Sequence, residues 1–122
     1  MDDVAQRAEL ASRTDPLSGL GNRRSIDIDL PDKIAEVQTR RSDGAAIRLA
    51  FVVIDIDGFK AINDRHGHAG GDAVLVEFAR RLKAATRATD TVARLGGDEF
   101  VVLLERSEEH TSELQSRSAI SY

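Results

Sequence analysis

Hydrophobic positions recur with a helical period in three segments of this chain. Residues 1–14 carry a narrow apolar stripe, and residues 73–87 place several apolar side chains on one face. The third segment lies between them. Asn22 is a suitable N-cap for it, its apolar positions include Ile26, Leu30, Ile34 and Val37, and it reaches a turn predicted at residues 42–44. We therefore expect three helices.

Prolines set the limits of the first two helices. Asp15 precedes Pro16, and the residue before a proline is pushed out of the helical region, so the first helix ends there. Pro31 lies inside the second helix, where a proline costs about 3 kcal/mol or more. We expect a kink or a restart at Pro31, with Asp29 as a possible cap.

Three further segments have the pattern of strands. Residues 49–54 are continuously apolar, which favours a central strand covered on both faces. Residues 91–95 and 100–104 flank Gly96 and Gly97, and glycines permit the positive φ that a two-residue hairpin turn requires. The predicted order is helix, helix, strand, helix, strand, strand.

Composition narrows the class of protein. The chain has 122 residues, enough for one domain, and a net charge of −4, which argues against a nucleic-acid partner. It has no cysteine, which fits a reducing compartment. No apolar run is long enough to span a bilayer, so we expect no direct membrane contact and a cytoplasmic location. A longer parent protein could still be tethered to a membrane through an unseen N-terminal region.

Two acidic clusters lie at predicted strand ends. Asp55 and Asp57 follow the apolar run, and Asp98 and Glu99 follow the two glycines of the hairpin. Carboxylates placed in this way suit a divalent metal ion that handles nucleotide phosphates.

A series of motifs connects these clusters. In order, they are residues 15–24 (DPLSGLGNRR), 55–60 (DIDGFK), 63–64 (ND), 67–68 (GH), 71–72 (GD) and 96–100 (GGDEF). In sequence and spacing the chain resembles the GGDEF domain of diguanylate cyclases, which make cyclic di-GMP from two GTP. The resemblance implies an α+β fold with a ferredoxin-like sheet, similar to nucleotidyl cyclases, and flanking helices.

The resemblance implies a metal site at the acidic clusters. Asp55, the backbone carbonyl of Ile56 and Asp98 would bind Mg²⁺ or Mn²⁺, and Glu99 would bind a second ion or orient the first site. Asp98 and Glu99 are the expected catalytic residues. Asp98 is the usual candidate for the base that activates the 3′-hydroxyl, although the metal alone can lower the hydroxyl pKa. For Asp55, a turn-capping role is the alternative.

The same resemblance assigns substrate contacts. Lys60 and the backbone N–H groups of Gly58 and Phe59 would bind the triphosphate near a helix start, with Gly96 and Gly97 forming the hairpin loop at the substrate. Asn63 and Asp72 would read guanine, whose acceptor and donors suit an amide and a carboxylate. His68 would lie near the substrate or shape its loop. The alternatives are a solvated surface lysine for Lys60 and turn or cap roles for Asn63 and Asp72.

Regulation and assembly also follow from the resemblance. Arg87 and Asp90 match an RxxD site at which cyclic di-GMP inhibits the enzyme. Catalysis would require a homodimer, because each protomer holds one GTP. Residues 1–14 would be the end of a helix carrying signals from an upstream sensor domain.

The C-terminal segment has a different character. Residues 106–122 resemble the in-frame translation of a sequencing adapter, so we expect residues 15–105 to be a truncated domain without its last strand or strands. Strand 49–54 would then expose an apolar edge, and the chain would fold poorly or aggregate alone. Two further readings remain: a non-catalytic module that binds GTP or cyclic di-GMP, and a fragment without function.

Overall fold

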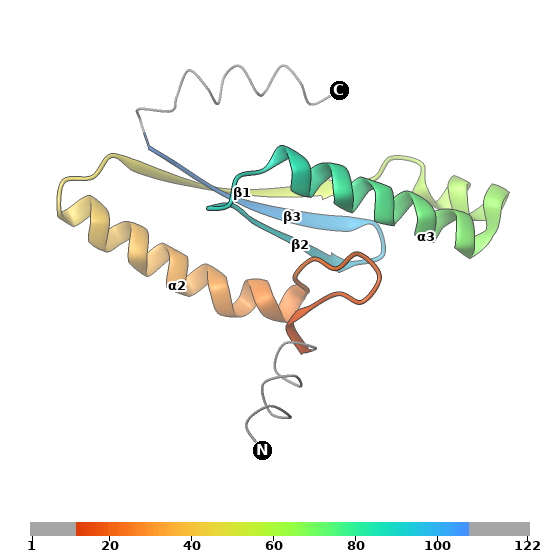
Figure 1. The fold of residues 1–122 in the computed structure, drawn as a ribbon, viewed down its shortest axis with the longest axis horizontal. Helices are drawn as coiled ribbons and strands as arrows, with labels where there is room; N and C mark the ends of the chain where they lie inside the picture. Colours follow the sequence, from red (N-terminus) through yellow and green to blue (C-terminus); the bar gives the residue numbers. More distant parts are fainter. Residues whose placement is uncertain (1–11, 108–122) are drawn as a thin grey trace.

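The computed structural model describes residues 12–107. Three strands form one antiparallel sheet in the order β1-β3-β2, with a long helix on each face (Figure 1). The predicted α+β fold is confirmed, and the predicted helix over residues 1–14 lies almost entirely outside the described residues. The elements in chain order are α2 (Arg23–Ser42), β1 (Ile47–Asp55), α3 (Phe59–Ala85), β2 (Thr91–Gly96) and β3 (Glu99–Ser107).

Helix α2 begins as predicted and continues past its proline. The Ser25 backbone N–H donates to Asn22 Oδ1 at 3.0 Å, which confirms the cap. The predicted restart at Pro31 is wrong, because α2 is one helix with Pro31 inside it. Pro31 has no N–H to donate to the Asp27 carbonyl, its usual helical partner. Both residues are exposed, so water can satisfy that carbonyl. Asp29 lies inside α2, where it forms an ion pair with Arg13 and accepts a hydrogen bond from the Ser25 hydroxyl.

Helix α3 consists of two segments that meet at Gly67. Gly67 has φ 73° and ψ 176°, outside the helical region, so the helix bends sharply there. The first segment starts at Phe59, after a loop at residues 56–58, and the second contains the helix predicted over residues 73–87 as far as Ala85, where α3 ends. The bend therefore folds the short helix that was expected to start near Lys60 back toward the longer one.

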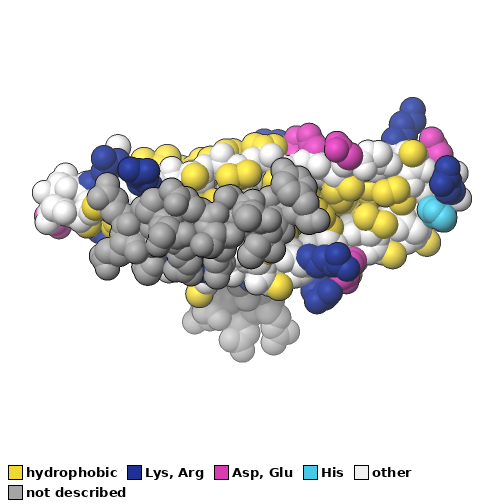
Figure 2. Space-filling view, turned by 90° about the horizontal axis from the view of Figure 1, so that it is seen from above, with side chains coloured by type: hydrophobic (Ala, Val, Ile, Leu, Met, Phe, Trp, Pro, Cys, Tyr) yellow, Lys and Arg dark blue, Asp and Glu magenta, His cyan; other side chains and the backbone are white. Residues whose placement is uncertain are grey.

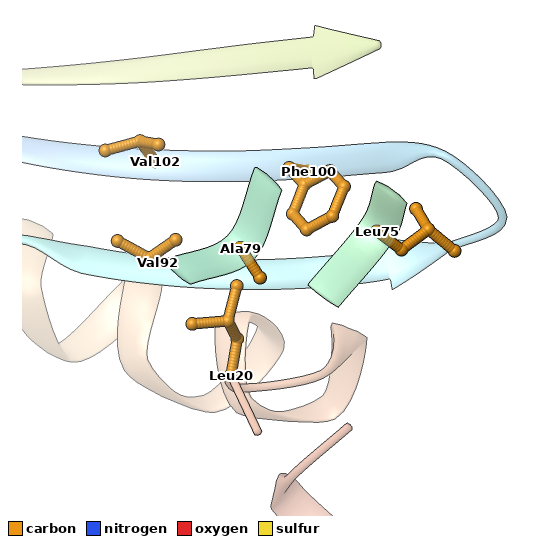
Figure 3. Packing of buried hydrophobic residues seen from close by; sticks show 6 residues of the cluster. All are labelled: Leu20, Leu75, Ala79, Val92, Phe100 and Val102. Atoms are coloured by element: carbon orange, nitrogen blue, oxygen red, sulfur yellow. The ribbon is translucent and has the colours of Figure 1, made fainter. Parts of the chain in front are cut away.

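The core lies on both faces of β3. On one face, Phe100 and Val102 pack with side chains from α3, β2 and the loop before α2 (Figure 3); the cluster consists of Leu20, Leu75, Ala79, Val92, Phe100 and Val102. The Phe100 ring also contacts Phe78, with ring centroids 4.9 Å apart. On the other face, Val101 packs with Ala93 and with Ile26 of α2. Both helices are thus held to the sheet through its middle strand.

Strand β1 is an edge strand of the described sheet. It pairs only with β3, and Phe51 and Val53 remain 48% and 54% exposed. Hydrophobic side chains also reach the surface on the face drawn in Figure 2. The expectation that this strand is covered on both faces is therefore wrong for the described residues, whereas the expected apolar edge is confirmed.

Strand β3 extends past the boundary predicted at Glu105. It ends at Ser107, and the buried Arg106 forms an ion pair of 2.6 Å with Asp90. Residues 108–122 lie outside the described part of the chain, and the assignment of residues 106–122 to an adapter stays a prediction.

Candidate functional site

The hairpin between β2 and β3 presents two carboxylates. Gly96 pairs with Glu99, so Gly97 and Asp98 form the turn, and the glycines adopt φ values of 146° and 51°. A side chain at either glycine would strain the backbone. Asp98 and Glu99 are half-buried, which keeps both carboxylates at the surface of the turn.

The end of β1 meets this turn. Asp55, the last residue of β1, lies directly opposite Glu99 in the antiparallel register. One residue later, the Ile56 backbone N–H donates to the Asp98 backbone oxygen at 3.3 Å. Sheet pairing therefore brings together all four residues predicted for the metal site, although they come from segments about forty positions apart in the sequence. We call Asp55, Ile56, Asp98 and Glu99 the acidic corner.

The acidic corner suits a divalent metal ion that takes its remaining ligands from phosphate and water. No group of three Asp, Glu, His or Cys side chains in residues 12–107 is arranged to hold a metal without other ligands. Mg²⁺ typically takes one or two carboxylates, with phosphates and water supplying the remaining ligands. The exposed Asp55 and the half-buried turn carboxylates match that requirement, so the residues present fit a divalent ion that arrives with a phosphate ligand.

An ion pair that the sequence analysis missed anchors the turn. The Arg94 guanidinium donates to the Asp15 carboxylate at 2.9 Å and to the Gly97 carbonyl oxygen at 3.0 Å. Burial tends to raise the pKa of the Asp15 carboxyl, but hydrogen bonds from Ser18 and the Arg94 charge outweigh it and hold this pKa below its ordinary value. Asp15 and Arg94 are 79 positions apart, so no local pattern could have paired them.

The loop after β1 leads into the first turn of α3. Gly58, in the left-handed conformation with φ 70°, is the N-cap of α3, and no side chain caps the helix there. Phe59 packs partly against the core, while Lys60 is exposed. The start of α3 therefore offers backbone N–H groups and one cation close after the acidic corner, an arrangement suited to phosphate.

The bend at Gly67 groups the predicted guanine-reading residues. Asn63, on the first segment of α3, packs against Gly71 on the second, and Asp72 is the next residue. Asn63 is half-buried and Asp72 is exposed. His68 directly follows the bend and is exposed.

The two residues of the predicted product site have different surroundings. The Asp90 side chain is fully buried and accepts hydrogen bonds from the Arg87 and Glu105 backbone N–H groups and from the Arg106 guanidinium. Burial tends to raise the pKa of Asp90, but these hydrogen bonds outweigh it and hold the pKa low. Asp90 thus fixes the turn after α3 to β3, while Arg87 is half-buried.

Comparison with known proteins decides the family. The sequence model of the diguanylate cyclase GGDEF domain matches residues 12–120. The chain belongs to the GGDEF domain family. Diguanylate cyclases of this family generally depend on a divalent metal ion, which agrees with the chemistry of the acidic corner.

Individual relatives agree with this assignment. The bifunctional diguanylate cyclase/cyclic di-GMP phosphodiesterase MucR of Pseudomonas aeruginosa is 49% identical over 94 residues, 77% of this chain and 13% of MucR. A sensory box/GGDEF family protein from Caulobacter crescentus superimposes with a TM-score of 0.73 at 42% identity, covering 86% of this chain and 66% of that one.

A second Caulobacter crescentus structure contains a ligand. The coiled coil and GGDEF domain of DgcB, in complex with c-di-GMP, superimposes with a TM-score of 0.77 at 29% identity, over 95% of this chain and 57% of that one.

Among the curated relatives, the chain spans only 13% of MucR and 32% of the diguanylate cyclase DgcS of Shewanella oneidensis. Within the described residues, no helix is long and apolar enough to cross a membrane.

Proposed function

We propose that this chain is the metal- and GTP-binding part of a diguanylate cyclase domain, whose reaction is 2 GTP → cyclic di-GMP + 2 pyrophosphate. The observation that carries the proposal is the acidic corner, in which β1 places Asp55 opposite Glu99 and the Ile56 N–H bonds to the Asp98 carbonyl. GGDEF family membership makes GTP the expected substrate.

Within the acidic corner, Asp55, the Ile56 carbonyl and Asp98 would hold Mg²⁺ or Mn²⁺, and Glu99 would hold a second ion or orient these ligands. A bound ion would neutralise phosphate charge and lower the pKa of the attacking 3′-hydroxyl. A carboxylate engaged with a metal is a weak base. Asp98 therefore acts chiefly by holding the ion, and a role as general base is the second possibility.

The start of α3 and its bend would hold the nucleotide. Lys60 and the N–H groups of Gly58 and Phe59 would bind the triphosphate, because the N-terminus of a helix attracts anions. Asn63 and Asp72 would bind the guanine edge, with His68 near the nucleotide. Gly96 and Gly97 allow the hairpin backbone to approach the substrate closely.

Assembly and control extend the proposal to the longer protein. One GTP per protomer requires two protomers facing each other, so that each 3′-hydroxyl reaches the other α-phosphate. An upstream sensor domain would govern that approach, and cyclic di-GMP would inhibit through Arg87. The burial of Asp90 favours a structural role for it in holding the turn that carries Arg87.

The alternative function is a non-catalytic module that binds GTP or cyclic di-GMP. It shares the binding residues, so binding alone does not separate it from the cyclase. The presence of all three acidic side chains of the corner favours the cyclase, because a pure sensor has no need of a complete metal site. Production of cyclic di-GMP by the longer protein would eliminate the alternative.

The first test is a calorimetric titration of the 122-residue chain with GTP, with and without Mg²⁺. We expect Mg²⁺-dependent binding that Asp55→Ala weakens at least tenfold, since a lost charged contact is worth about 1.5–3 kcal/mol. Asp57→Ala is the matched control, because it removes the same charge two positions away and should leave binding intact. Equal effects of the two substitutions would contradict the assignment of Asp55.

A further inference from the structure

Gly71 lies at the closest approach of the two segments of α3. It is buried, and it faces Asn63, which is eight positions earlier and on the other side of the bend at Gly67. A Cβ added at Gly71 would overlap Asn63 Oδ1, and it would lie 2.9 Å from Asn63 Cγ and 3.3 Å from Phe59 Cζ. Only a residue without a side chain leaves the Asn63 amide in its present position.

The overlap concerns the functional end of Asn63. Flexible side chains can often move away from a new methyl group, and in Asn63, which is half-buried against Gly71, the atoms that must move are those of the amide. Phe59, on the same side, packs partly against the core and cannot yield freely. The simplest way to accommodate a Cβ at Gly71 is therefore to rotate the Asn63 side chain, because its amide is the flexible end that the Cβ would overlap, and this rotation turns the amide away from its present direction.

We propose that Gly71 is a specificity-determining residue that fixes the orientation of the Asn63 amide toward the base of the nucleotide. The inference rests on the proposed function, in which Asn63 reads guanine. Guanine and adenine differ in the donors and acceptors along their edges, so an amide discriminates between them only if its oxygen and nitrogen point in a defined direction. Gly71 does not contact the base and acts through Asn63.

The chain offers a matched control in the neighbouring residue. A Cβ at Gly70 would lie 2.5 Å from His66 Cβ and would not approach Asn63. Gly70→Ala therefore shifts the backbone of the same bend, because neither Cβ can rotate away, while its new methyl group makes no contact with Asn63. A general effect of replacing a glycine at the bend would appear in both variants, whereas an effect through Asn63 appears only in Gly71→Ala.

The test measures the affinities of the 122-residue chain for GTP and for ATP, each with Mg²⁺, by calorimetry. We expect Gly71→Ala to reduce the preference for GTP by about tenfold, the effect of losing one well-oriented hydrogen bond. Gly70→Ala should keep the preference. Asn63→Ala should lose it, and Gly71→Ala should add nothing further in the Asn63→Ala background, because the overlapping atoms are then gone.

Several results would overturn the inference. An unchanged preference in Gly71→Ala would do so, as would an equal loss in Gly70→Ala or a further loss in the Asn63→Ala background. In these cases GTP binding by the wild-type chain leaves the proposed function intact. Absence of GTP binding by the wild-type chain would overturn the proposed function together with the inference.

A folding control covers the case in which Gly71→Ala does not fold. If Gly71→Ala loses its helical circular dichroism, Asn63→Ala is compared with the double variant Asn63→Ala/Gly71→Ala. A folded double variant with the nucleotide preference of Asn63→Ala supports the inference, because removal of Asn63 then relieves the overlap. An unfolded double variant contradicts it, because Gly71 is then required independently of Asn63.

Discussion

Strands β3 and β1 pair with each other and have similar apolar sequences, yet their surroundings differ. Residues 100–103 of β3 are at most 4% exposed, because β3 has a strand on each side and a helix over each face. In β1, Phe51 and Val53 are about half exposed. Apolar content therefore predicts a strand, but position in the sheet decides its burial. The acidic corner joins the two, with Asp55 from the exposed strand and Asp98 and Glu99 from the turn that leads into the buried β3.

The largest expected effect comes from making the same substitution in both strands. Phe100→Ala should lower the free energy of unfolding by about 4 kcal/mol, because it removes a fully buried ring and leaves a cavity. Phe51→Ala should cost less than about 1 kcal/mol, as expected for an exposed position. Urea unfolding of the two variants checks this contrast. Similar losses would mean that β1 is buried in solution.

The second test concerns the end of β3. Asp90→Asn should destabilise the fold by about 3 kcal/mol, because it leaves the buried Arg106 guanidinium without its counter-charge. Asp27→Asn, at an exposed position on α2, is the control and should have little effect. Urea unfolding of the three chains at neutral pH measures these differences.

The difference in stability between the wild-type chain and Asp90→Asn should also change with pH in a defined direction. The folded pKa of Asp90 is lowered, so its contribution is fully present above the unfolded pKa of about 4 and is lost as the pH falls through the lower folded pKa. The stability advantage of the wild-type chain over Asp90→Asn should therefore shrink below about pH 4. An advantage that stays constant into that range would contradict the ion pair.

The third test concerns the anchor of the hairpin turn. A double-mutant cycle of Asp15→Asn and Arg94→Gln should give a coupling energy of about 1 kcal/mol, since both side chains are largely buried and joined by a charged hydrogen bond. The cycle of Glu77 and Arg80, an exposed pair on α3, should show a smaller coupling. Additive losses at Asp15 and Arg94 would mean that the pair does not anchor the turn.

The fourth test concerns the open edge of β1. There we expect the smallest effect on stability but a measurable effect on self-association. Val53→Lys should change the free energy of unfolding by no more than about 0.5 kcal/mol. It should also reduce self-association measured by sedimentation, because a charged edge strand resists pairing with another copy. Val76→Lys on α3 removes an equally large exposed side chain and should leave association unchanged. Equal reductions would place the association elsewhere than at the β1 edge.

The sequence predicted the elements that depend on local patterns. The Asn22 cap, the hairpin at Gly96 and Gly97 and the apolar strands are all confirmed, because each is set by residues close together in the chain. The restart predicted at Pro31 was wrong because the cost of a proline depends on whether the orphaned carbonyl faces water, which a pattern of apolar positions does not reveal.

Contacts between distant segments were harder to predict. The acidic corner followed from the family motifs and agrees with the register of β1 and β3. The Arg94–Asp15 pair, the Asp90–Arg106 pair and the fit of Asn63 against Gly71 depend on how the segments pack, and each residue alone has an ordinary local role.

The central claim is that the end of the exposed β1 and the hairpin turn before the buried β3 together form one metal-dependent GTP site. The most direct test titrates Mn²⁺ into the ¹⁵N-labelled chain with GTP present and follows paramagnetic broadening of the backbone amide signals. The account predicts early broadening both at residues 55–58 and at residues 97–99, with residues 41–46 unaffected. Broadening in only one of the two segments, or first at residues 41–46, would contradict it.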